Sequence, residues 1–312
     1  MPSEINRRSF IRSIFGLTSA LPATVQAAES RPKKAFVWCD LKGGHVGYPT
    51  GLVVPHERPG SLMKLVAAAV LVDEGLFGHN ERFDCTGTYT PPHRGKNAQS
   101  VHCQFAHGQI EIVDAIALSC NCFFAHAAER LTARAFLTKA RALGLSSPCA
   151  GRRAGLFPLH YEDMTGPSMP YVLGLAEDFK PGCLQLMRLA AFIALGPHGK
   201  LPVLHSSENM ELLAKEKPLP VALTEKSHDI LVKGMRQAVL KGTCRKLDPK
   251  DTMKVAAKTG TTPHGAKFQS HVIGFFPFEK PTNAFCLFSP SGTAQDSAIP
   301  QVREILFSTT WF

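Results

Sequence analysis

The sequence predicts a mixed α/β (α+β) fold in which an antiparallel sheet is flanked by helices. One apolar strand pattern occurs near the start, at residues 35–41, and three more occur late, at residues 253–257, 271–278 and 283–289, separated by Gly, Pro and Asn. Helical patterns fill the interval between them. Both ends of the chain are therefore expected to contribute strands to one sheet, with an all-helical lobe inserted around residues 79–220.

Residues 61–77 are rich in Leu, Ala and Val almost all round, which predicts a buried central helix that ends at Gly75 and Gly78. Residues 79–108 are predicted to be loop. Further helices are predicted at residues 109–118, 122–131, 133–143, 182–195, 224–240 and 300–307. Since no repeat or low-complexity linker divides the chain, residues 31–312 are expected to form one domain.

The charge and composition exclude several classes of protein. The 312-residue chain carries 35 Lys and Arg against 25 Asp and Glu, a formal charge of +10. The basic residues are scattered, and two Trp and four Tyr offer few platforms on which bases could stack, so nucleic acid is not expected as a partner. The apolar stretches are shorter than the roughly 20 residues that a membrane span requires, which excludes an integral membrane bundle.

The first 27 residues resemble an export signal of the twin-arginine type. Asn6-Arg7-Arg8-Ser9-Phe10-Ile11-Arg12 precedes a weakly apolar stretch at residues 14–21, and Val25-Gln26-Ala27 is a small-residue cleavage pattern. We therefore expect a periplasmic protein that folds before it is exported. The alternative interpretation is an amphipathic N-terminal helix with ordinary arginines.

Three short motifs occur in order: Ser61-Leu62-Met63-Lys64, Ser119-Cys120-Asn121 and Lys258-Thr259-Gly260-Thr261. Each alone is weak, because Ser30-Arg31-Pro32-Lys33 and Ser207-Glu208-Asn209 fit the first two patterns as well. The context favours Ser61, which begins a long apolar helix. All three motifs in this order are expected by composition in fewer than about one sequence in a hundred.

The residue types and their spacing predict an acyl-transfer site. Ser61 and Lys64 are three residues apart on one face of a helix, so the amine can reach the hydroxyl. Burial would favour the neutral form of this amine, which can then take the serine proton. The helix N-terminus adds partial positive charge and free N–H groups, which suit a developing oxyanion.

The other two motifs are expected to supply supporting groups. Ser119, at a break between two helical patterns, would relay the proton to a leaving amine, and Asn121 would hold a substrate amide. Lys258 and Thr259, at the end of an apolar strand, would hold a substrate carboxylate. Gly260 would let the strand backbone come close to it.

With these motifs the sequence resembles the transpeptidase domain of penicillin-binding proteins, in the wider serine DD-peptidase and β-lactamase superfamily. The resemblance covers roughly residues 35–290. Its further landmarks are Pro59-Gly60, Phe123-Phe124, Pro181 before Leu184-Gln185-Leu186, Gly234-Met235 and Gly242-Thr243. Departures from the usual pattern are Gly174-Leu175-Ala176, Ala257 before Lys258, and Cys120 with Cys122 around Asn121. A small form without the membrane anchor and large N-terminal module of polymer-building members is expected to have a specialised substrate.

The resemblance implies a DD-peptidase/β-lactamase-like fold and a DD-transpeptidase or DD-carboxypeptidase that works through a serine acyl-enzyme. The catalytic residues would be Ser61, Lys64, Ser119 and Lys258, and the substrate-binding residues would be Asn121, Thr259, Gly260 and Thr261. The backbone N–H groups of Ser61 and Thr261 would form the oxyanion hole. The acyl donor would be a D-Ala-D-Ala stem peptide of peptidoglycan, with β-lactams as its mimics, and no cofactor or metal is expected.

Two other functions remain open on the same resemblance. A β-lactamase or β-lactam sensor would need an efficient base for deacylation, and Asn121 favours the penicillin-binding pattern instead. A non-catalytic envelope protein would keep the fold and bind peptidoglycan or other cell-envelope proteins. In that case Ser61 would be an ordinary helix cap, and Lys64 would extend to solvent.

The nine cysteines include no CxxC pair. Cys85 and Cys103 lie in a segment rich in Gly, Pro and His, where a disulfide would close a loop. Because His93, His102 and His107 share this segment, a zinc site is an alternative, and free thiols are a third; no standard ligand spacing occurs. Cys120 is interpreted as a small apolar side chain in preference to a thiol catalyst.

Overall fold

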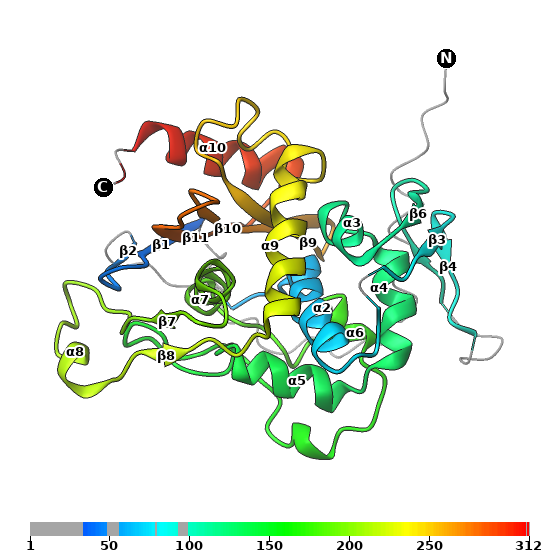
Figure 1. Cartoon of the computed structure of the whole chain (residues 1–312), viewed down its shortest axis with the longest axis horizontal. Helices are drawn as coiled ribbons and strands as arrows, with labels where there is room; N and C mark the ends of the chain where they lie inside the picture. Colours follow the sequence, from blue (N-terminus) through cyan, green and yellow to red (C-terminus); the bar gives the residue numbers. More distant parts are fainter. Residues whose placement is uncertain (1–33, 49–55, 79, 93–98, 310, 312) are drawn as a thin grey trace, which may run out of the picture.

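The computed structural model describes residues 34–48, 56–78, 80–92, 99–309 and 311, and its centre is a five-stranded sheet (Figure 1). The strand order is β2-β1-β11-β10-β9, and every neighbouring pair is antiparallel. The strands are β1 (Ala35–Asp40), β2 (Val46–Gly47), β9 (Ala256–His264), β10 (Lys267–Phe276) and β11 (Asn283–Ser289). The prediction that both ends of the chain meet in one antiparallel sheet is confirmed.

Alternation along the strands builds a core on each face of this sheet. On β11, Cys286 and Phe288 face the larger core, whereas Phe285 and Leu287 face the smaller one. The β1 side chains alternate in the same way, with Val37 on the larger core. Both faces are apolar because helices cover both of them.

In the described part of the chain several helices contribute side chains to the larger core, among them the three longest, and another helix lies on the opposite face of the sheet (Figure 1). The three longest are α2 (Met63–Asp73), α7 (Cys183–Leu195) and α9 (Glu225–Leu240), and the helix on the opposite face is α10 (Ile299–Ser308). Residues 63–71 of α2 are all buried, which confirms the predicted central helix. A helix without a polar face can lie only between other elements.

The segment between α2 and α7 is mainly helical, and it also contains pairs of very short strands. Its helices are α3 (Ile112–Ala117), α4 (Asn121–Ala127), α5 (Ala133–Ala142) and α6 (Met169–Val172). Its strands are β3 (Phe83–Cys85), β4 (Thr88–Tyr89), β5 (Val101–His102) and β6 (Gly108–Ile110), paired β3 with β6 and β4 with β5. The sequence predicted loop here, because strands of two or three residues are too short to show a period. The segment between α7 and α9 contains β7 (Lys200–Leu201), α8 (Leu212–Lys215) and β8 (Leu219–Pro220).

The boundaries of β9 correct one prediction from the sequence. The strand was expected to end at the Lys258-Thr259-Gly260 motif, but it runs from Ala256 to His264 with the motif inside it. Its polar half pairs along its whole length with β10, so backbone hydrogen bonds extend the strand past the apolar run. The motif therefore lies along an edge strand of the sheet.

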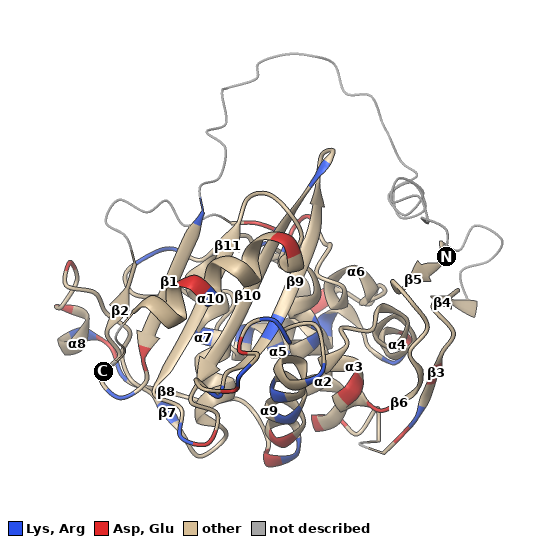
Figure 2. Cartoon of the chain, turned by 90° about the horizontal axis from the view of Figure 1, so that it is seen from above, with Lys and Arg blue, Asp and Glu red and all other residues tan. Residues whose placement is uncertain are grey.

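The predicted export signal at residues 1–27 lies outside the described residues. Among those that are described, no helix combines the length and the apolar character needed to cross a membrane. Figure 2 shows acidic and basic segments interspersed over helices, strands and loops.

The smaller core should depend strongly on Phe285. Its ring is fully buried and lies 6.2 Å, centroid to centroid, from the rings of both Phe36 and Phe276. Because Phe285→Ala leaves a cavity between packed layers, we expect it to lower the free energy of unfolding by about 3–5 kcal/mol in a urea titration. The exposed Leu240→Ala serves as control, and a loss below about 1 kcal/mol for Phe285→Ala would contradict tight packing here.

Candidate active site

Ser61 lies in a 3₁₀ turn, Gly60–Leu62, that runs directly into α2. Gly60 has φ +57°, which favours glycine, and its N–H donates to the Gly174 carbonyl at 3.0 Å. Ser61 is half-buried at this helix start, while Lys64 is fully buried one turn later. The first motif therefore lies at the start of the predicted helix, with Ser61 half-buried and the Lys64 side chain fully buried.

The second motif forms the connection between α3 and α4. Ser119 has φ +55°, a conformation that non-glycine residues rarely adopt. Cys120 is the N-cap of α4, and its Sγ accepts a hydrogen bond from the N–H of Phe123 at 3.3 Å. This cap fixes the turn that directs Ser119 and Asn121 toward Lys64.

The Lys64 amine joins the first two motifs. Its Nζ donates to the Ser119 carbonyl at 2.7 Å and to Asn121 Oδ1 at 2.5 Å, and Ser119 Oγ lies 3.4 Å away. The Asn121 Nδ2 in turn donates to the His102 carbonyl at 2.8 Å, which sets the orientation of the amide. Among the described residues Lys64 forms no hydrogen bond with Ser61 Oγ, a contact that often tightens only when substrate is bound.

The Lys258 amine, in the third motif, also contacts the Ser119 hydroxyl. Its Nζ donates to Ser119 Oγ at 2.8 Å and to the Thr259 carbonyl at 2.9 Å. Ser119 Oγ therefore lies between the amines of Lys64 and Lys258, both of them fully buried. This arrangement offers a path along which a proton can move between two amines and a hydroxyl.

Burial lowers the pKa of both amines. The pKa of Lys64 falls to about 8, chiefly because desolvation disfavours the ammonium form. The pKa of Lys258 falls to about 7 through desolvation first and then repulsion from Lys64. Both amines therefore titrate near neutral pH, where a proton can be exchanged at low cost.

Strand β9 packs directly on the turn that holds Ser61. A Cβ at Gly260 would collide with the Pro59 carbonyl, and one at Gly60 would lie 3.0 Å from the Thr261 carbonyl. The glycines are needed because the two backbones approach closely. This contact brings the backbone of Thr261 beside that of Ser61.

Two contacts outside the predicted set support β9. The Thr259 hydroxyl donates to Thr243 Oγ1 at 3.1 Å, and Thr261 Oγ1 accepts from the N–H of Ala294 at 3.1 Å. The sequence indicated Thr243 only as part of a Gly-Thr landmark, and nothing in it indicated Ala294. All eight predicted site residues thus come from three chain segments that meet at the start of α2.

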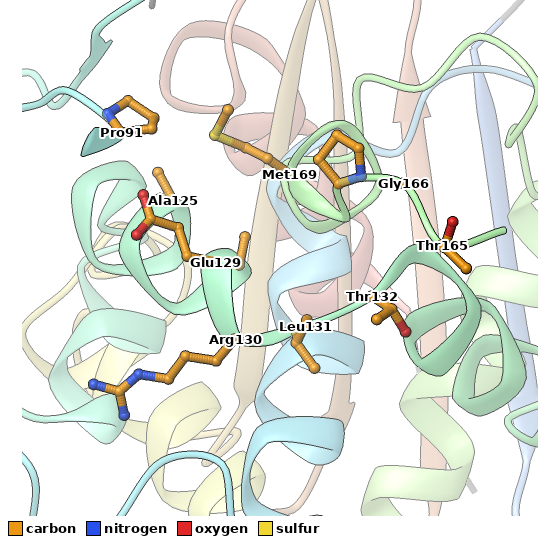
Figure 3. A pocket seen from close by; sticks show the side chains of 11 residues that line it. Pro91, Ala125, Glu129, Arg130, Leu131, Thr132, Thr165, Gly166 and Met169 are labelled. Atoms are coloured by element: carbon orange, nitrogen blue, oxygen red, sulfur yellow. The ribbon is translucent and has the colours of Figure 1, made fainter. Parts of the chain in front are cut away.

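A separate cavity of about 320 Å³ lies at the C-terminal end of α4 (Figure 3). Glu129, Arg130, Thr132 and Met169 are among the residues that line it, and none of the predicted site residues does so. It is therefore distinct from the site around Ser61.

Comparison with known proteins identifies one family. The model of the penicillin binding protein transpeptidase domain matches residues 42–306. No curated protein matches the chain.

Three solved structures share the fold. Pseudomonas aeruginosa PBP2, in complex with WCK 5153, aligns with 19% identity and a TM-score of 0.72 over 89% of this chain and 71% of its own. The D,D-transpeptidase domain of an Eggerthella lenta peptidoglycan glycosyltransferase aligns with 17% identity and a TM-score of 0.69. This alignment covers 88% of this chain and 78% of that one. Helicobacter pylori PBP2, in complex with MreC, gives 16% and 0.71, and the alignment covers 89% of this chain but only 60% of that one.

Replacing Lys258 should stabilise the protein. Because the pKa of Lys258 is lower in the folded than in the unfolded chain, the unfolded state binds more protons as the pH falls from about 10 toward 7, and stability falls with it. Lys258→Met removes this penalty, so we expect its thermal midpoint at pH 7 to exceed that of the parent by at least about 2–4 °C, with the difference shrinking toward pH 10.

The exposed Lys254→Met is the matched control, since Lys254 pairs at the surface with Glu279. It should leave the pH dependence unchanged. A Lys258→Met protein that melts below the parent at pH 7 would show that Lys258 is not a destabilising buried amine.

Proposed function

Because the chain belongs to the penicillin-binding protein transpeptidase family, we propose that it is a serine acyltransferase that acts on D-Ala-D-Ala stem peptides of peptidoglycan. The observation that carries this proposal is the meeting of Lys64 and Lys258 at the Ser119 hydroxyl, beside the half-buried Ser61. A helix start, a polar loop and an edge strand supply these groups together. We infer the substrate and the acyl-enzyme from this geometry and from the three motifs.

In the proposed reaction Ser61 Oγ attacks the carbonyl carbon of the penultimate D-Ala. Lys64 in its neutral form takes the hydroxyl proton, and the new O–C bond gives a tetrahedral oxyanion that faces the N–H groups of Ser61 and Thr261. The C–N bond then breaks, and Ser119 passes a proton to the leaving amine of D-alanine. Asn121 holds the substrate amide, while Lys258 and Thr259 bind the terminal carboxylate, with Gly260 giving room for the approach.

Substrate binding would itself adjust the two amines. A carboxylate near Lys258 favours the ammonium form there. The charge on Lys258 then repels a proton on Lys64, because the two amines share Ser119 Oγ. The bound substrate thus promotes the neutral Lys64 that the attack requires.

One observation favours a transpeptidase or carboxypeptidase over the alternative β-lactamase. Rapid hydrolysis of a penicilloyl ester needs a base that activates water, which in class A β-lactamases is the carboxylate of a glutamate. In the described part of the chain no carboxylate forms a hydrogen bond with Lys64, Ser119 or Lys258. The acyl-enzyme is therefore expected to be long-lived with penicillin.

The proposed location is the periplasm, where peptidoglycan is assembled, and the proposed route is the twin-arginine pathway. These proposals rest on residues 1–27 and on the family. An envelope protein is a proposed partner, since the related Helicobacter pylori protein has been solved in complex with MreC.

We expect penicillin to form a covalent adduct with this protein. Intact mass spectrometry of the purified chain before and after brief incubation with benzylpenicillin should show one added penicillin, and Ser61→Ala should show none, because it lacks the nucleophile. Ser291→Ala, on the loop after β11, is the matched serine control. The same spectrum reports whether residues 1–27 are present.

A stable adduct on both the parent and Ser61→Ala would assign the nucleophile elsewhere. Rapid loss of the adduct with consumption of the antibiotic would identify the alternative β-lactamase. No adduct and no antibiotic consumed would favour the non-catalytic envelope protein.

Acylation should accelerate as the pH rises through about 8, the pKa of Lys64. Below this pH the base is protonated, so the second-order rate of penicillin labelling should fall by up to about tenfold per pH unit toward pH 6. Lys64→Met should label about 10²–10⁴-fold more slowly and lose this dependence. A parent rate that does not change between about pH 6 and 9 would contradict Lys64 as the base.

A further inference from the structure

A second cluster of side chains lies beside the Ser119-Cys120-Asn121 loop and takes no part in the proposed reaction. The ligand atoms of Cys85, Cys103, His107 and Cys120 all lie within 4.8 Å of one another. Cys85 and Cys120 are buried, while Cys103 and His107 are half-buried, which leaves a path of entry. We propose that these four residues form a structural zinc site that holds the loop in place.

Three of the distances between these ligand atoms lie close to those around a tetrahedral zinc ion. Cys85 Sγ lies 3.9 Å from Cys103 Sγ and 3.3 Å from His107 Nδ1, and Cys103 Sγ lies 3.6 Å from Cys120 Sγ. Zinc at about 2.3 Å from sulfur and about 2.0 Å from nitrogen separates its ligands by about 3.6–3.8 Å. Three thiolates and one imidazole are a common ligand set for structural zinc.

Backbone pairing holds three of these ligands in register without help from the metal. Cys85 ends β3, opposite Gly108 on β6, and the N–H of His107 donates to the Cys85 carbonyl at 3.0 Å. The N–H of Cys103, directly after β5, donates to the Gly87 carbonyl at 2.9 Å. Two short strand pairs therefore present the three ligands to Cys120 at the start of α4.

Hydrogen bonds to sulfur support thiolates at this position. Cys103 Sγ accepts from the N–H of Asn121 at 3.2 Å and from that of Cys122 at 3.5 Å. Backbone N–H groups directed at a ligand sulfur are typical of the surroundings of a metal–thiolate centre. Zinc also explains why three sulfurs share one site, since a thiol is only a weak hydrogen-bond donor to another thiol.

Zinc fits the cluster better than the other two states that the sequence allows. All nine cysteines lie in the described ranges, and none of them is joined in a disulfide there. A disulfide between Cys85 and Cys103 would need a sulfur separation of about 2.05 Å and would leave Cys120 and His107 without a partner in the cluster. Of the histidines in this segment, His102 instead contacts Thr88, and His93 lies outside the described residues.

Cys122 is the fifth sulfur nearby and provides a test of the ligand set. Its Sγ lies 3.5 Å from Cys103 Sγ, but it also contacts the Val101 carbonyl at 3.6 Å and is not one of the four mutually close groups. A four-coordinate site is complete without it. Cys122 should therefore be dispensable for zinc.

The zinc would affect the active site only by holding the Ser119-Cys120-Asn121 loop in place. Cys120 lies between Ser119, whose backbone is in the left-handed region, and Asn121. The Asn121 amide donates to the carbonyl of His102, the residue before Cys103. A metal held by Cys103 and Cys120 fixes both sides of this contact, so the four ligands are positioning residues.

Metal content tests the site directly. The full chain, purified without chelator, should carry about one zinc per chain by elemental mass spectrometry, and chain loaded with Co²⁺ should show the visible bands of tetrahedral cobalt–thiolate. Cys103→Ala and Cys120→Ala should lower bound zinc at least about tenfold. Cys122→Ala and Cys244→Ala, the latter a buried cysteine outside the cluster, should keep it.

If Cys103→Ala does not fold, the parent protein supplies the readout. Removal of zinc by a chelator should lower its thermal midpoint, and added Zn²⁺ should restore it. Chelation should also slow penicillin labelling. That last effect rests on the proposed function, whereas metal content does not, so the two proposals can fail separately.

Three results would overturn the site. The first is a chain that binds neither Zn²⁺ nor Co²⁺ under reducing conditions. The second is a denatured, unreduced mass that lacks two hydrogen atoms, together with peptide mapping that joins two of these cysteines. The third is a loss of zinc from Cys122→Ala as large as that from Cys103→Ala, which would overturn the ligand set.

Discussion

The contact between two buried lysine amines and one serine hydroxyl is the constraint on which the rest of the site depends. Lys64 and Lys258 both direct Nζ at Ser119 Oγ, at 3.4 and 2.8 Å. Two ammonium groups inside a protein cost stability through desolvation and mutual repulsion. The same desolvation lowers the pKa values of both amines toward neutrality, where a lysine can act as a base. The proposed function and the local loss of stability thus have one physical origin, the desolvation of the two amines.

Close backbone approach is what brings the three segments together. Strand β9 lies at the edge of the sheet and contacts the turn before α2, where a Cβ on Gly260 would collide with the Pro59 carbonyl and one on Gly60 would lie 3.0 Å from the Thr261 carbonyl. The loop with Ser119 then reaches the same point from α3 and α4, with its own backbone in an unfavourable region. Each segment is held by its surroundings: α2 by the burial of residues 63–71, β9 by pairing with β10, and the loop by the cap at Cys120. The side chains of the site are therefore held in position although they come from three separate segments of the chain.

The sequence predicts the parts of this structure that repeat a pattern over several residues. Strand β11 matches its predicted residues 283–289, since the apolar run is bounded by Thr282 and Pro290, and α2 is apolar all round because it is buried all round. The three motifs locate the eight predicted site residues, and the segments that carry them meet at the start of α2. The extension of β9 beyond Lys258 could not be predicted, because pairing with β10 and not apolarity continues the strand. Two further features could not be predicted from the sequence. The hydrogen bond from Lys64 to Asn121 follows a left-handed backbone at Ser119. The cluster of three thiols and one imidazole is held by strand pairs that are too short to show a period in the sequence.

We propose that these residues form a single acylating centre whose oxyanion hole lies between the start of α2 and β9. The decisive experiment is a crystal structure of the protein treated with benzylpenicillin. We expect electron density that is continuous from Ser61 Oγ to the carbonyl carbon of the opened ring, with the carbonyl oxygen accepting hydrogen bonds from the N–H groups of Ser61 and Thr261. Antibiotic bound covalently to another side chain, or an acyl oxygen turned away from Thr261, would contradict it.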